Sequence, residues 1–319
     1  MTDTRFKDRS CPCCARRDRT RLFDLPASRF CASNWTYRTD YAAILNISPN
    51  ARFAIAQCSE CGFIYAEAEP NAAFLAQVYD EVVKHDANTS ANENVVGCAH
   101  RMRYVADLLD LAPPAGPRSA LDYGCGLGTT LRLLEAARVR SVGYDLSGVR
   151  LSYASRSSTA RVVGERRELL ADAPFDMIVC DNVLEHLPDP ADAIEFLASE
   201  AAPGAVLYVS VPDFDRRFLD AQTHAYHTGA RLDMSLNTWE HLNYFDLLHL
   251  DRILGRVGFL PIPEAKLPKI SVVNIGLRRE PWLVPRLKNV GATGLRLARY
   301  AATGLALRSP NRAFYRFGG

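Results

Sequence analysis

Several features are missing from this sequence of 319 residues, and their absence excludes whole classes of protein. No uninterrupted apolar run approaches the roughly 18 residues that a membrane-spanning helix needs. The first residues, Met1 to Ser10, are polar and of mixed charge, so they do not resemble a secretory signal peptide. Internal repeats and low-complexity tracts are also lacking, which excludes a repeat architecture. We therefore expect a cytoplasmic globular protein.

The composition is ordinary, with 48% hydrophobic and 23% charged residues. A chain of this length can bury one large core and a small accessory module, so two domains are expected. The net charge of +2 is unevenly distributed. Residues 278–319 contain nine Lys or Arg and only Glu280, a net charge of +8, which leaves −6 for the rest.

The sequence divides into four segments. Residues 1–70 contain pairs of cysteines in turn-rich sequence, and 71–94 read as a short helix at 71–84 followed by a polar linker. Residues 95–280 form the main domain and begin with a helix at 95–111. Residues 281–319 form a basic extension in which 289–308 could fold as an amphipathic helix.

Short apolar runs alternate with helical stretches in the main domain. Strands are expected at 119–123, 141–145, 160–163, 175–181 and 205–211, and helices at 127–138, 147–156, 189–201 and 245–259. This alternation predicts an α/β fold with a doubly wound, mostly parallel sheet. Two further strand-like runs, 259–265 and 270–278, lie so close together that they favour a terminal antiparallel hairpin.

A glycine-rich loop follows the first strand, in the segment Leu121–Gly128 (LDYGCGLG). Glycines allow a sharp turn and a close approach of the backbone to a ligand, although a purely structural turn would also explain them. Asp145 ends the next strand, where a carboxylate can accept hydrogen bonds from both hydroxyls of a ribose. A dinucleotide fits less well, because Thr129 replaces a small residue of that fingerprint and Asp122 would lie beside the pyrophosphate. Loop and acid together predict a nucleoside site.

Five blocks in the same order resemble class I S-adenosylmethionine-dependent methyltransferases, and the resemblance covers about residues 95–279. The blocks are Leu121–Gly128, Val142–Ser147, Phe175–Pro190, Pro203–Pro212 and the region from His241–Phe245 to Val257–Phe259. The resemblance implies a Rossmann-like sheet of seven strands and S-adenosylmethionine as cofactor.

Eight residues would then line the cofactor: Asp122, Gly124, Gly126, Gly128, Asp145, Leu146, Asp181 and Asn182. The glycines would lie along the methionine and ribose, Asp145 would hold the ribose hydroxyls and Leu146 would cover the adenine. Asp181 and Asn182 would lie near the methionine moiety. Asp122 would face its cationic amino-acid end.

Two histidines are candidates for the catalytic step. Methyl transfer requires the enzyme to position an acceptor and remove its proton, and imidazole titrates in a suitable range. His186 lies at a strand-to-helix turn on the ligand edge, and His241 follows the fifth strand. A structural role remains open for both. Glu185 and His186 could brace the turn, and His241 could pack beside Trp239.

A catalytic metal is not expected. Ubiquinone-pathway O-methyltransferases and small-RNA terminal 2′-O-methyltransferases look similar around His186, and some of them bind a divalent ion through Glu-x-x-Glu-His. This chain has Asn182 in place of the first glutamate.

Four of the nine cysteines have the spacing of a zinc site: Cys11, Cys14, Cys58 and Cys61. Two C-x2-C knuckles can complete a closed tetrahedral Zn²⁺ site, which predicts a structural metal and leaves Cys13 as a bystander. Unligated thiols are the alternative. Similar cysteine-rich modules precede bacterial methyltransferases that act on sugars and surface glycans.

We therefore expect methyl transfer to a small-molecule or glycan acceptor, such as a sugar or a related bacterial metabolite. A hydroxyl group is the expected methyl acceptor, and a carbon atom is the less favoured alternative. RNA methylation is one alternative, which the run of arginines between Arg16 and Arg21 would support, although such runs usually form a solvated face. A cofactor-binding regulatory or scaffolding protein without catalysis is the alternative of another class. The basic extension suggests an anionic partner, such as a lipid-linked glycan at the inner membrane face, with nucleic acid less expected.

Overall fold

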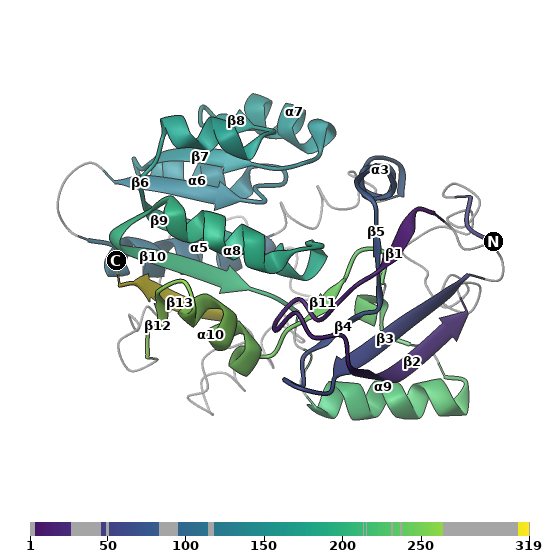
Figure 1. Ribbon diagram of the computed structural model, residues 1–319. Helices are drawn as coiled ribbons and strands as arrows, with labels where there is room; N and C mark the ends of the chain where they lie inside the picture. Colours follow the sequence, from purple (N-terminus) through teal and green to yellow (C-terminus); the bar gives the residue numbers. More distant parts are fainter. Residues whose placement is uncertain are drawn as a thin grey trace, which may run out of the picture.

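The structure is a computed structural model that describes residues 4–26, 46–48, 51–82, 95–113, 118–212, 214, 216–230, 232–236, 238–263 and 312–318. It contains a large α/β part and a smaller, mainly β part at the N-terminal end of the chain (Figure 1). The linker expected after residue 84, the run at 270–278 and the helix expected at 289–308 lie outside these residues.

A seven-stranded sheet with the order β12-β13-β10-β9-β6-β7-β8 forms the centre of the large part. Its strands are β6 (Ser119–Tyr123), β7 (Arg140–Tyr144), β8 (Arg161–Val163), β9 (Phe175–Asp181), β10 (Ala201–Ser210), β12 (Phe259–Pro261) and β13 (Arg312–Phe317). Pairing is parallel from β8 to β10, and β13 is antiparallel to both of its neighbours. The expected doubly wound, mostly parallel sheet is confirmed. Its order reverses at β6, and such a switch point is where open α/β sheets bind ligands.

The far end of the sheet differs from the expected hairpin. β12 pairs with β13 from the end of the chain, with Phe259 opposite Phe317. Phe314 and Tyr315 are buried on opposite faces of the sheet. Arg316 stays at the surface and donates to the carbonyls of Gly204 and Leu111. The sequence did not predict this strand, because its arginines made the segment look like part of a basic extension. Three consecutive apolar residues between Arg312 and Arg316 are sufficient to form it.

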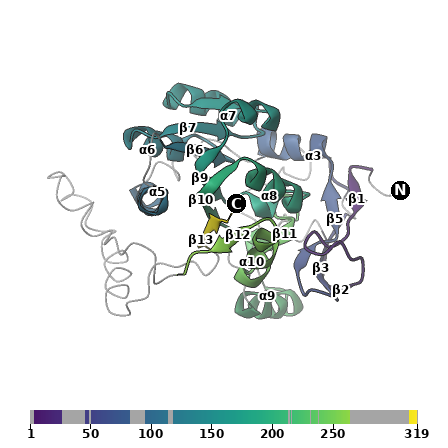
Figure 2. The same ribbon diagram turned by 60° about the vertical axis from the view of Figure 1, so that its left-hand side comes forward.

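Helices cover both faces of the sheet (Figures 1 and 2). On one face, alternate strand residues such as Leu121 and Ile178 pack with helices α8 and α10, and on the other, Ala120 and Met177 pack with α5 and α6. A parallel sheet buried on both faces explains the nearly continuous apolar runs of its strands. The helices of this part are α5 (Val95–Leu111), α6 (Thr129–Ala136), α7 (Gly148–Ser157), α8 (Pro190–Ser199) and α10 (Leu247–Gly255), with the short 3-10 turns η2 (Arg166–Ala171) and η3 (Leu184–His186).

The smaller part, here called the cysteine module, contains residues 4–70 as far as they are described. β1 (Phe6–Asp8) pairs with β5 (Ala68–Pro70). A second sheet, of order β11-β4-β3-β2, combines β2 (Arg19–Pro26), β3 (Arg52–Cys58) and β4 (Ile64–Ala66) with β11 (Asn243–Tyr244). Because β11 comes from the segment after β10, the division of the sequence at residue 70 is not a separation in space.

A second hydrophobic core joins the module to the segment between β10 and α10. Phe23 and Ile55 of the module pack with Phe214, Trp239 and Tyr244. Helix α9 (Arg216–Thr228), which the sequence analysis did not predict, lies beside β2 in both ribbon views. The remaining short elements are η4 (Met234–Leu236), α3 (Ala72–Gln77) and the π-helix η1 (Val78–Val82). The single helix expected at 71–84 is therefore an α-helix that widens into a π-helical turn.

Candidate active site

The glycine loop closes on the end of β7. Gly124 and Cys125 donate their backbone N–H groups to the carbonyl of Tyr144, at 2.7 and 2.9 Å. Gly124 has a φ of +83°, and a Cβ there would lie 2.3 Å from Val183 Cγ2. Gly126 has a φ of +54° and faces open space, since a Cβ there would meet nothing within 4 Å. The loop thus leaves room for a ligand directly beside its backbone.

Asp145 lies between this loop and the start of α7. Its Oδ2 accepts from the N–H of Gly126 and its Oδ1 from the N–H of Ser147, both at 2.9 Å. The residue is buried, whereas the next side chain, Leu146, is 70% exposed. Each carboxylate oxygen retains a second lone pair, so Asp145 can still accept two hydrogen bonds from a ligand.

Asp122 has a buried carboxyl group with one oxygen that lacks a partner among the described residues. It is 3% exposed, and among the described residues its Oδ2 has no hydrogen-bond partner. Burial and, to a smaller extent, the charge of nearby Asp181 raise the pKa of Asp122 to about 8, although Arg101 acts in the opposite direction. A positively charged group of a ligand would satisfy this oxygen. The unpartnered carboxyl therefore fits the amino-acid end of S-adenosylmethionine.

Asp181 and Asn182 lie at the carboxyl end of β9, as expected. Asp181 Oδ1 accepts from Ser210 Oγ at 2.7 Å and from Asn182 Nδ2 at 3.0 Å. Arg101 Nη2 lies 4.0 Å from Asp181 Oδ2. Asn182 has a φ of +55° and donates its backbone N–H to the Ser210 carbonyl. The sequence singles out neither Arg101, which lies outside the five blocks, nor Ser210, which is one position within the Pro203–Pro212 block.

The two candidate histidines lie side by side, with ring centroids 4.8 Å apart. His186 Nδ1 is 2.8 Å from the carbonyl of Glu240, and His241 Nδ1 is 2.8 Å from the carbonyl of Ser235. A carbonyl can only accept, so in each neutral ring Nδ1 carries the proton and Nε2 keeps a lone pair. Both imidazoles therefore present a proton-accepting nitrogen.

The electrostatic surroundings keep these rings neutral. Burial lowers the pKa of His186 well below its usual range, and the neighbouring His241 lowers it further. Burial also lowers the pKa of His241. Neutral imidazoles are the form that can accept a proton at physiological pH.

Glu185 adds a carboxylate oxygen to the two histidine nitrogens, so that three atoms able to bind a metal ion lie together. Its Oε1 lies 3.7 Å from His186 Nε2, and its Oε2 is buried without a hydrogen-bond partner among the described residues. Donor atoms of Glu185, His186 and His241 all lie within 4.8 Å of one another. In the sequence, Asn182 in place of the first glutamate of Glu-x-x-Glu-His argues against a catalytic metal. His241, from a distant segment, supplies a donor that the local motif lacks.

Tyr79, in the π-helix η1, packs near both His186 and Arg150. Its ring centroid lies 6.1 Å from that of His186, and the Arg150 guanidinium carbon lies 5.2 Å above the Tyr79 ring. Arg150 belongs to α7, which begins just after Asp145. Tyr79 therefore bridges the cofactor and histidine sides of the site. No sequence signal pointed to it, because the contact depends on how η1 docks.

The four predicted zinc ligands meet in one cluster. Sγ–Sγ distances are 3.6 Å between Cys11 and Cys61 and 3.5 Å between Cys14 and Cys58, and all four atoms lie within 4.8 Å of one another. Tetrahedral zinc with Zn–S bonds of about 2.3 Å requires sulfurs about 3.8 Å apart. The cluster fits zinc, and Cys13 is not part of it.

Each knuckle closes in the same way. Ala15 donates its N–H to the Cys11 carbonyl, and Gly62 donates to the Cys58 carbonyl, at 2.7 and 3.0 Å. Both donors have positive φ, +63° and +80°. Burial opposes ionisation of Cys58, but the N–H groups of Cys61 and Glu60 outweigh it and lower the pKa of Cys58 to about 7. Such N–H groups aimed at sulfur favour a thiolate.

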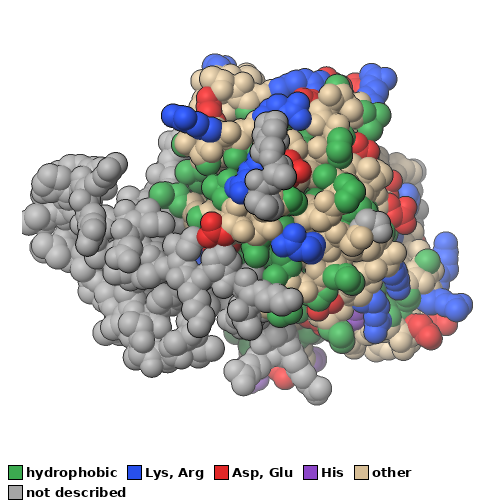
Figure 3. All heavy atoms as spheres, turned by 90° about the vertical axis from the view of Figure 1, so that its left-hand side faces the viewer, with side chains coloured by type: hydrophobic (Ala, Val, Ile, Leu, Met, Phe, Trp, Pro, Cys, Tyr) green, Lys and Arg blue, Asp and Glu red, His purple; other side chains and the backbone are tan. Residues whose placement is uncertain are grey.

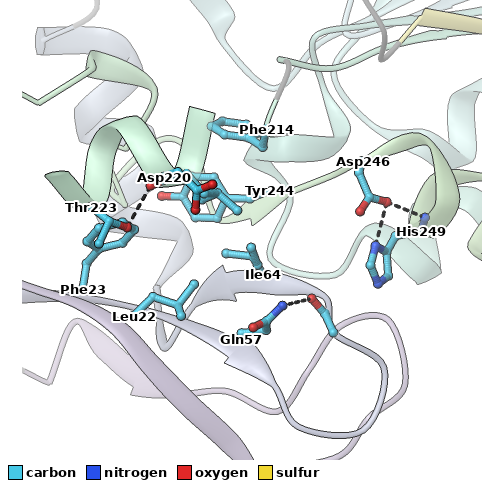
Figure 4. Close-up of a pocket in the computed structure, with 12 residues that line it drawn as sticks. Leu22, Phe23, Gln57, Ile64, Phe214, Asp220, Thr223, Tyr244, Asp246 and His249 are labelled. Atoms are coloured by element: carbon cyan, nitrogen blue, oxygen red, sulfur yellow. Dashed lines mark hydrogen bonds and ion pairs between the residues drawn. The ribbon is translucent and has the colours of Figure 1, made fainter. Parts of the chain in front are cut away.

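A separate pocket of about 380 Å³ lies between the module, α9 and the start of α10 (Figure 4). Its apolar lining includes Phe23, Ile64 and Phe214, and its polar lining includes Asp220 and Asp246, with no Lys or Arg among the lining residues. The Phe214 ring also lies 6.5 Å from His241. This pocket therefore adjoins the histidine side of the site.

Comparison with known proteins agrees with this geometry. A family model for a methyltransferase domain matches residues 98–263, more than half of the 319 residues. Trans-aconitate 2-methyltransferase of Methylobacterium nodulans is 35% identical over 117 residues, which cover 35% of this chain and 45% of that protein. Ubiquinone biosynthesis O-methyltransferase of Methylococcus capsulatus is 33% identical over 118 residues, covering 34% of this chain and 48% of that protein.

Among solved structures, magnesium protoporphyrin IX methyltransferase of Synechocystis with bound SAH aligns with a TM-score of 0.46 and 17% identity, over 60% of this chain and 91% of that chain. The chain spans about half the length of the curated relatives it matches. The family match, the strand order and the loop with its acids lead to one conclusion: this chain belongs to the methyltransferase domain family and has the fold of the class I S-adenosylmethionine-dependent methyltransferases.

Proposed function

We propose that the protein transfers a methyl group from S-adenosylmethionine to a hydroxyl of a sugar, a surface-glycan precursor or a related bacterial metabolite. The observation that carries the proposal is the pair of neutral imidazoles, His186 and His241, at the carboxyl edge of the sheet. His186 follows β9 near the carboxyl edge of the sheet and His241 lies beside it, and this is the edge at which open α/β sheets bind ligands, which supports the proposal. A neutral Nε2 can take the proton of a hydroxyl, and because the pKa of His186 is lowered, the transfer relies on the acidity that the oxygen gains as it bonds to the methyl carbon.

On the cofactor side, Gly124, Gly126 and Gly128 would line the methionine and ribose. Asp145, held between the N–H groups of Gly126 and Ser147, would accept the ribose hydroxyls through its remaining lone pairs. The exposed Leu146 would cover the adenine. Asp122 would pair with the ammonium group, and Asp181 and Asn182, at the carboxyl end of β9, would lie near the methionine moiety of the cofactor.

When bound, the cofactor would supply a methyl group activated by its positively charged sulfur, and the acceptor oxygen would bond to the methyl carbon as the bond from that carbon to the sulfur breaks. His186 Nε2 takes the proton that the hydroxyl loses. The Glu240 carbonyl stabilises the resulting imidazolium through Nδ1–H. His241 cannot accept a second proton easily at this distance, so it orients the acceptor by hydrogen bonding.

The pocket beside Phe214 supports a sugar-like acceptor. Aromatic and aliphatic walls suit the flat apolar faces of a sugar ring, and the carboxylates of Asp220 and Asp246 can accept from its hydroxyls. A lining without Lys or Arg disfavours a phosphorylated group within the pocket itself.

A second candidate chemistry uses the same nitrogens as metal ligands. Glu185, His186 and His241 could hold a divalent ion that binds the acceptor oxygen. Manganese binding measured by electron paramagnetic resonance would distinguish a metal site from a histidine base. One ion per chain that is lost in Glu185→Gln supports the metal, whereas no binding leaves His186 as the base.

RNA as the acceptor receives less support from the module. Arg19 lies 2.5 Å from Asp8 and 3.8 Å from Glu67, and Arg21 lies 2.6 Å from Glu67 and 3.6 Å from Asp24. The charges of Arg19 and Arg21 are offset by these carboxylates within the module, which reduces their attraction for phosphates. On the face shown in Figure 3, basic and acidic side chains are likewise intermixed over the described surface.

We also propose a structural zinc ion at the four cysteines and contact of residues 281–311 with an anionic partner at the membrane surface. Residues 312–317 belong to the sheet, so only the part before them is available for that role. Within the described residues, no helix has both the length and the apolar character needed to cross a membrane.

The proposed activity is tested by incubating the full chain with S-adenosylmethionine and a panel of nucleotide sugars, carboxylic acids and RNA. We expect formation of S-adenosylhomocysteine with a sugar substrate. Turnover with RNA alone would favour the RNA alternative. The regulatory alternative would be favoured if the protein binds S-adenosylhomocysteine but shows no turnover, either with the substrate panel or with a cell extract.

A further inference from the structure

A buried arginine of the cysteine module reaches both segments that carry the histidines. The side chain of Arg9, two residues before Cys11, is 4% exposed. Its Nη1 donates to the Leu242 carbonyl at 2.9 Å and its Nη2 to the Pro188 carbonyl at 2.7 Å. Leu242 directly follows His241, and Pro188 follows His186 by two residues. One rigid guanidinium therefore spans the two histidine segments.

Asn243 completes the connection. It is fully buried, and its Oδ1 accepts from Arg9 Nη2 at 3.0 Å. Its Nδ2 donates to the carbonyls of Leu184 and Leu187, at 2.8 and 2.7 Å. The carbonyls on both sides of His186 are thus held by one amide, and that amide is held by Arg9.

Arg9 is fixed in turn by the module. Its backbone N–H donates to the Glu67 carbonyl at 2.9 Å, and Arg19 Nη1 donates to the Arg9 carbonyl at 3.2 Å. Glu69 Oε2 lies 3.6 Å from Arg9 Nε. A guanidinium removed from water is costly unless it is paired and hydrogen-bonded, so its position must satisfy all of these partners together. The position of Arg9 therefore transmits the geometry of the module to the histidines.

We propose that Arg9 is a positioning residue that sets the orientation of His186 and His241, which makes the cysteine module a working part of the acceptor side of the site. Without the guanidinium, the 242–243 segment and the turn at 184–188 lose one of their anchors and keep only their direct bonds, from Asn243 Nδ2 to the Leu184 and Leu187 carbonyls and from the Leu242 N–H to the Glu185 carbonyl. The Glu240 carbonyl then no longer lies in a fixed position opposite His186 Nδ1. The tautomer of that ring becomes mixed, and its Nε2 is no longer uniformly free. The consequence for rate rests on the proposed function, whereas the orientation of the rings does not.

The test uses the full chain with ¹⁵N-labelled histidine, and NMR reports which nitrogen of each ring carries the proton. His186→Asn and His241→Asn assign the two signals among the seven histidines. In the native protein both should show Nδ1–H. In Arg9→Gln both should move toward a mixture of tautomers. His249, whose Nδ1 is bound by Asp246 Oδ1 at 2.7 Å, should keep its signal and serves as an internal reference.

Arg52→Gln is the matched control, because Arg52 belongs to the same module but pairs with Asp24 at an exposed position. It should leave all histidine signals in place. If Arg9→Gln does not fold, Arg9→Lys takes its place, since one ammonium can reach one carbonyl and should release at least one of the two rings. Unchanged tautomers in folded Arg9→Gln, or in Arg9→Lys if that is the variant that folds, would overturn the proposal.

Calorimetry with S-adenosylhomocysteine separates this proposal from the proposed function. Arg9→Gln should retain the native affinity within about twofold, because Arg9 does not touch the glycine loop. If the native protein does not bind this ligand at all, the proposed function fails while the NMR result still decides the role of Arg9. With an acceptor in hand, we expect Arg9→Gln to lower kcat about tenfold to hundredfold, the usual cost of a misplaced reacting group. Added guanidinium ion should restore part of that loss.

Discussion

The proposed cofactor side and the proposed acceptor side of the candidate site are built in different ways. The cofactor side comes largely from one crossover unit, residues 121–147, in which the bond from Gly126 to Asp145 joins positions 19 apart. The acceptor side combines Arg9, Tyr79, His186 and His241, and the bond from Arg9 to Leu242 joins positions 233 apart. Local backbone geometry defines the first side. The second depends on contacts between distant segments, which include those of Arg9 in the cysteine module, so changes in the module should affect it selectively.

The variant His186→Ala should give the largest difference between the two sides, because it should lower the rate and leave the cofactor affinity nearly unchanged. Loss of the proton acceptor should lower kcat by about 10²- to 10⁴-fold, while the affinity for S-adenosylhomocysteine stays close to native. Steady-state kinetics with the identified acceptor and calorimetry with the cofactor product measure the two quantities. An unchanged rate would return His186 to a role in bracing the turn. An equal loss in rate and cofactor affinity would show that the two sides are not separable.

The next largest effect concerns the module itself. The native protein should contain about one zinc per chain, and Cys58→Ser should release it and lower the melting temperature, because an open tetrahedral site loses the chelate that closes both knuckles. Metal analysis and thermal unfolding measure these changes. Cys13→Ser should keep the zinc, with only a modest loss of stability since Cys13 is 1% exposed. A native protein without zinc would refute the structural metal.

A smaller change is expected on the cofactor side from Asp145→Ala. Two hydrogen bonds to a charged acceptor disappear, each contributing about 1.5–3 kcal/mol, so the Kd should rise at least about a hundredfold. The N–H groups of Gly126 and Ser147 also lose their partner, which adds to the loss. The histidine NMR signals should stay native. Unchanged affinity in calorimetry would remove Asp145 from the site.

The smallest effect is a pH dependence that only the cofactor side should show. Burial raises the pKa of Asp122 to about 8, so the free carboxyl group keeps its proton at pH 7. A cationic ligand favours the ionised form, and binding must then release the proton. Affinity should therefore rise with pH toward 8 by up to about tenfold per unit and level off above it. Asp122→Asn should bind more weakly and lose this slope, and a slope equal to the native one would exclude Asp122.

Most of the large sheet and the cofactor side could be predicted from the sequence. Strands 119–123 and 175–181 and the helix at 95–111 have the expected bounds, because each shows its own apolar period. Helix α9 and the strand at 312–317 were missed. The first is strongly polar over much of its length, and the second lies in a segment that the sequence analysis characterised by its net charge.

The acceptor side could be predicted only in part. His186 and His241 were both chosen from their places after strands, but nothing in the sequence showed that their rings would be 4.8 Å apart. Glu185 was read as part of the turn, and its buried carboxyl beside both rings emerged from the fold. Arg9 and Tyr79 carry no motif at all.

The sequence by itself determined the doubly wound sheet, the glycine loop with its acids and the pairing of cysteines into knuckles. Each of these is specified by residue type and spacing within a few to about twenty positions, where backbone geometry leaves few alternatives. The tertiary structure alone decided that β11 joins the module, that β13 enters the sheet and that Arg9 holds the segments of both histidines. These contacts join distant positions, and which of many apolar and polar segments meet depends on packing the whole chain at once, which no local pattern encodes.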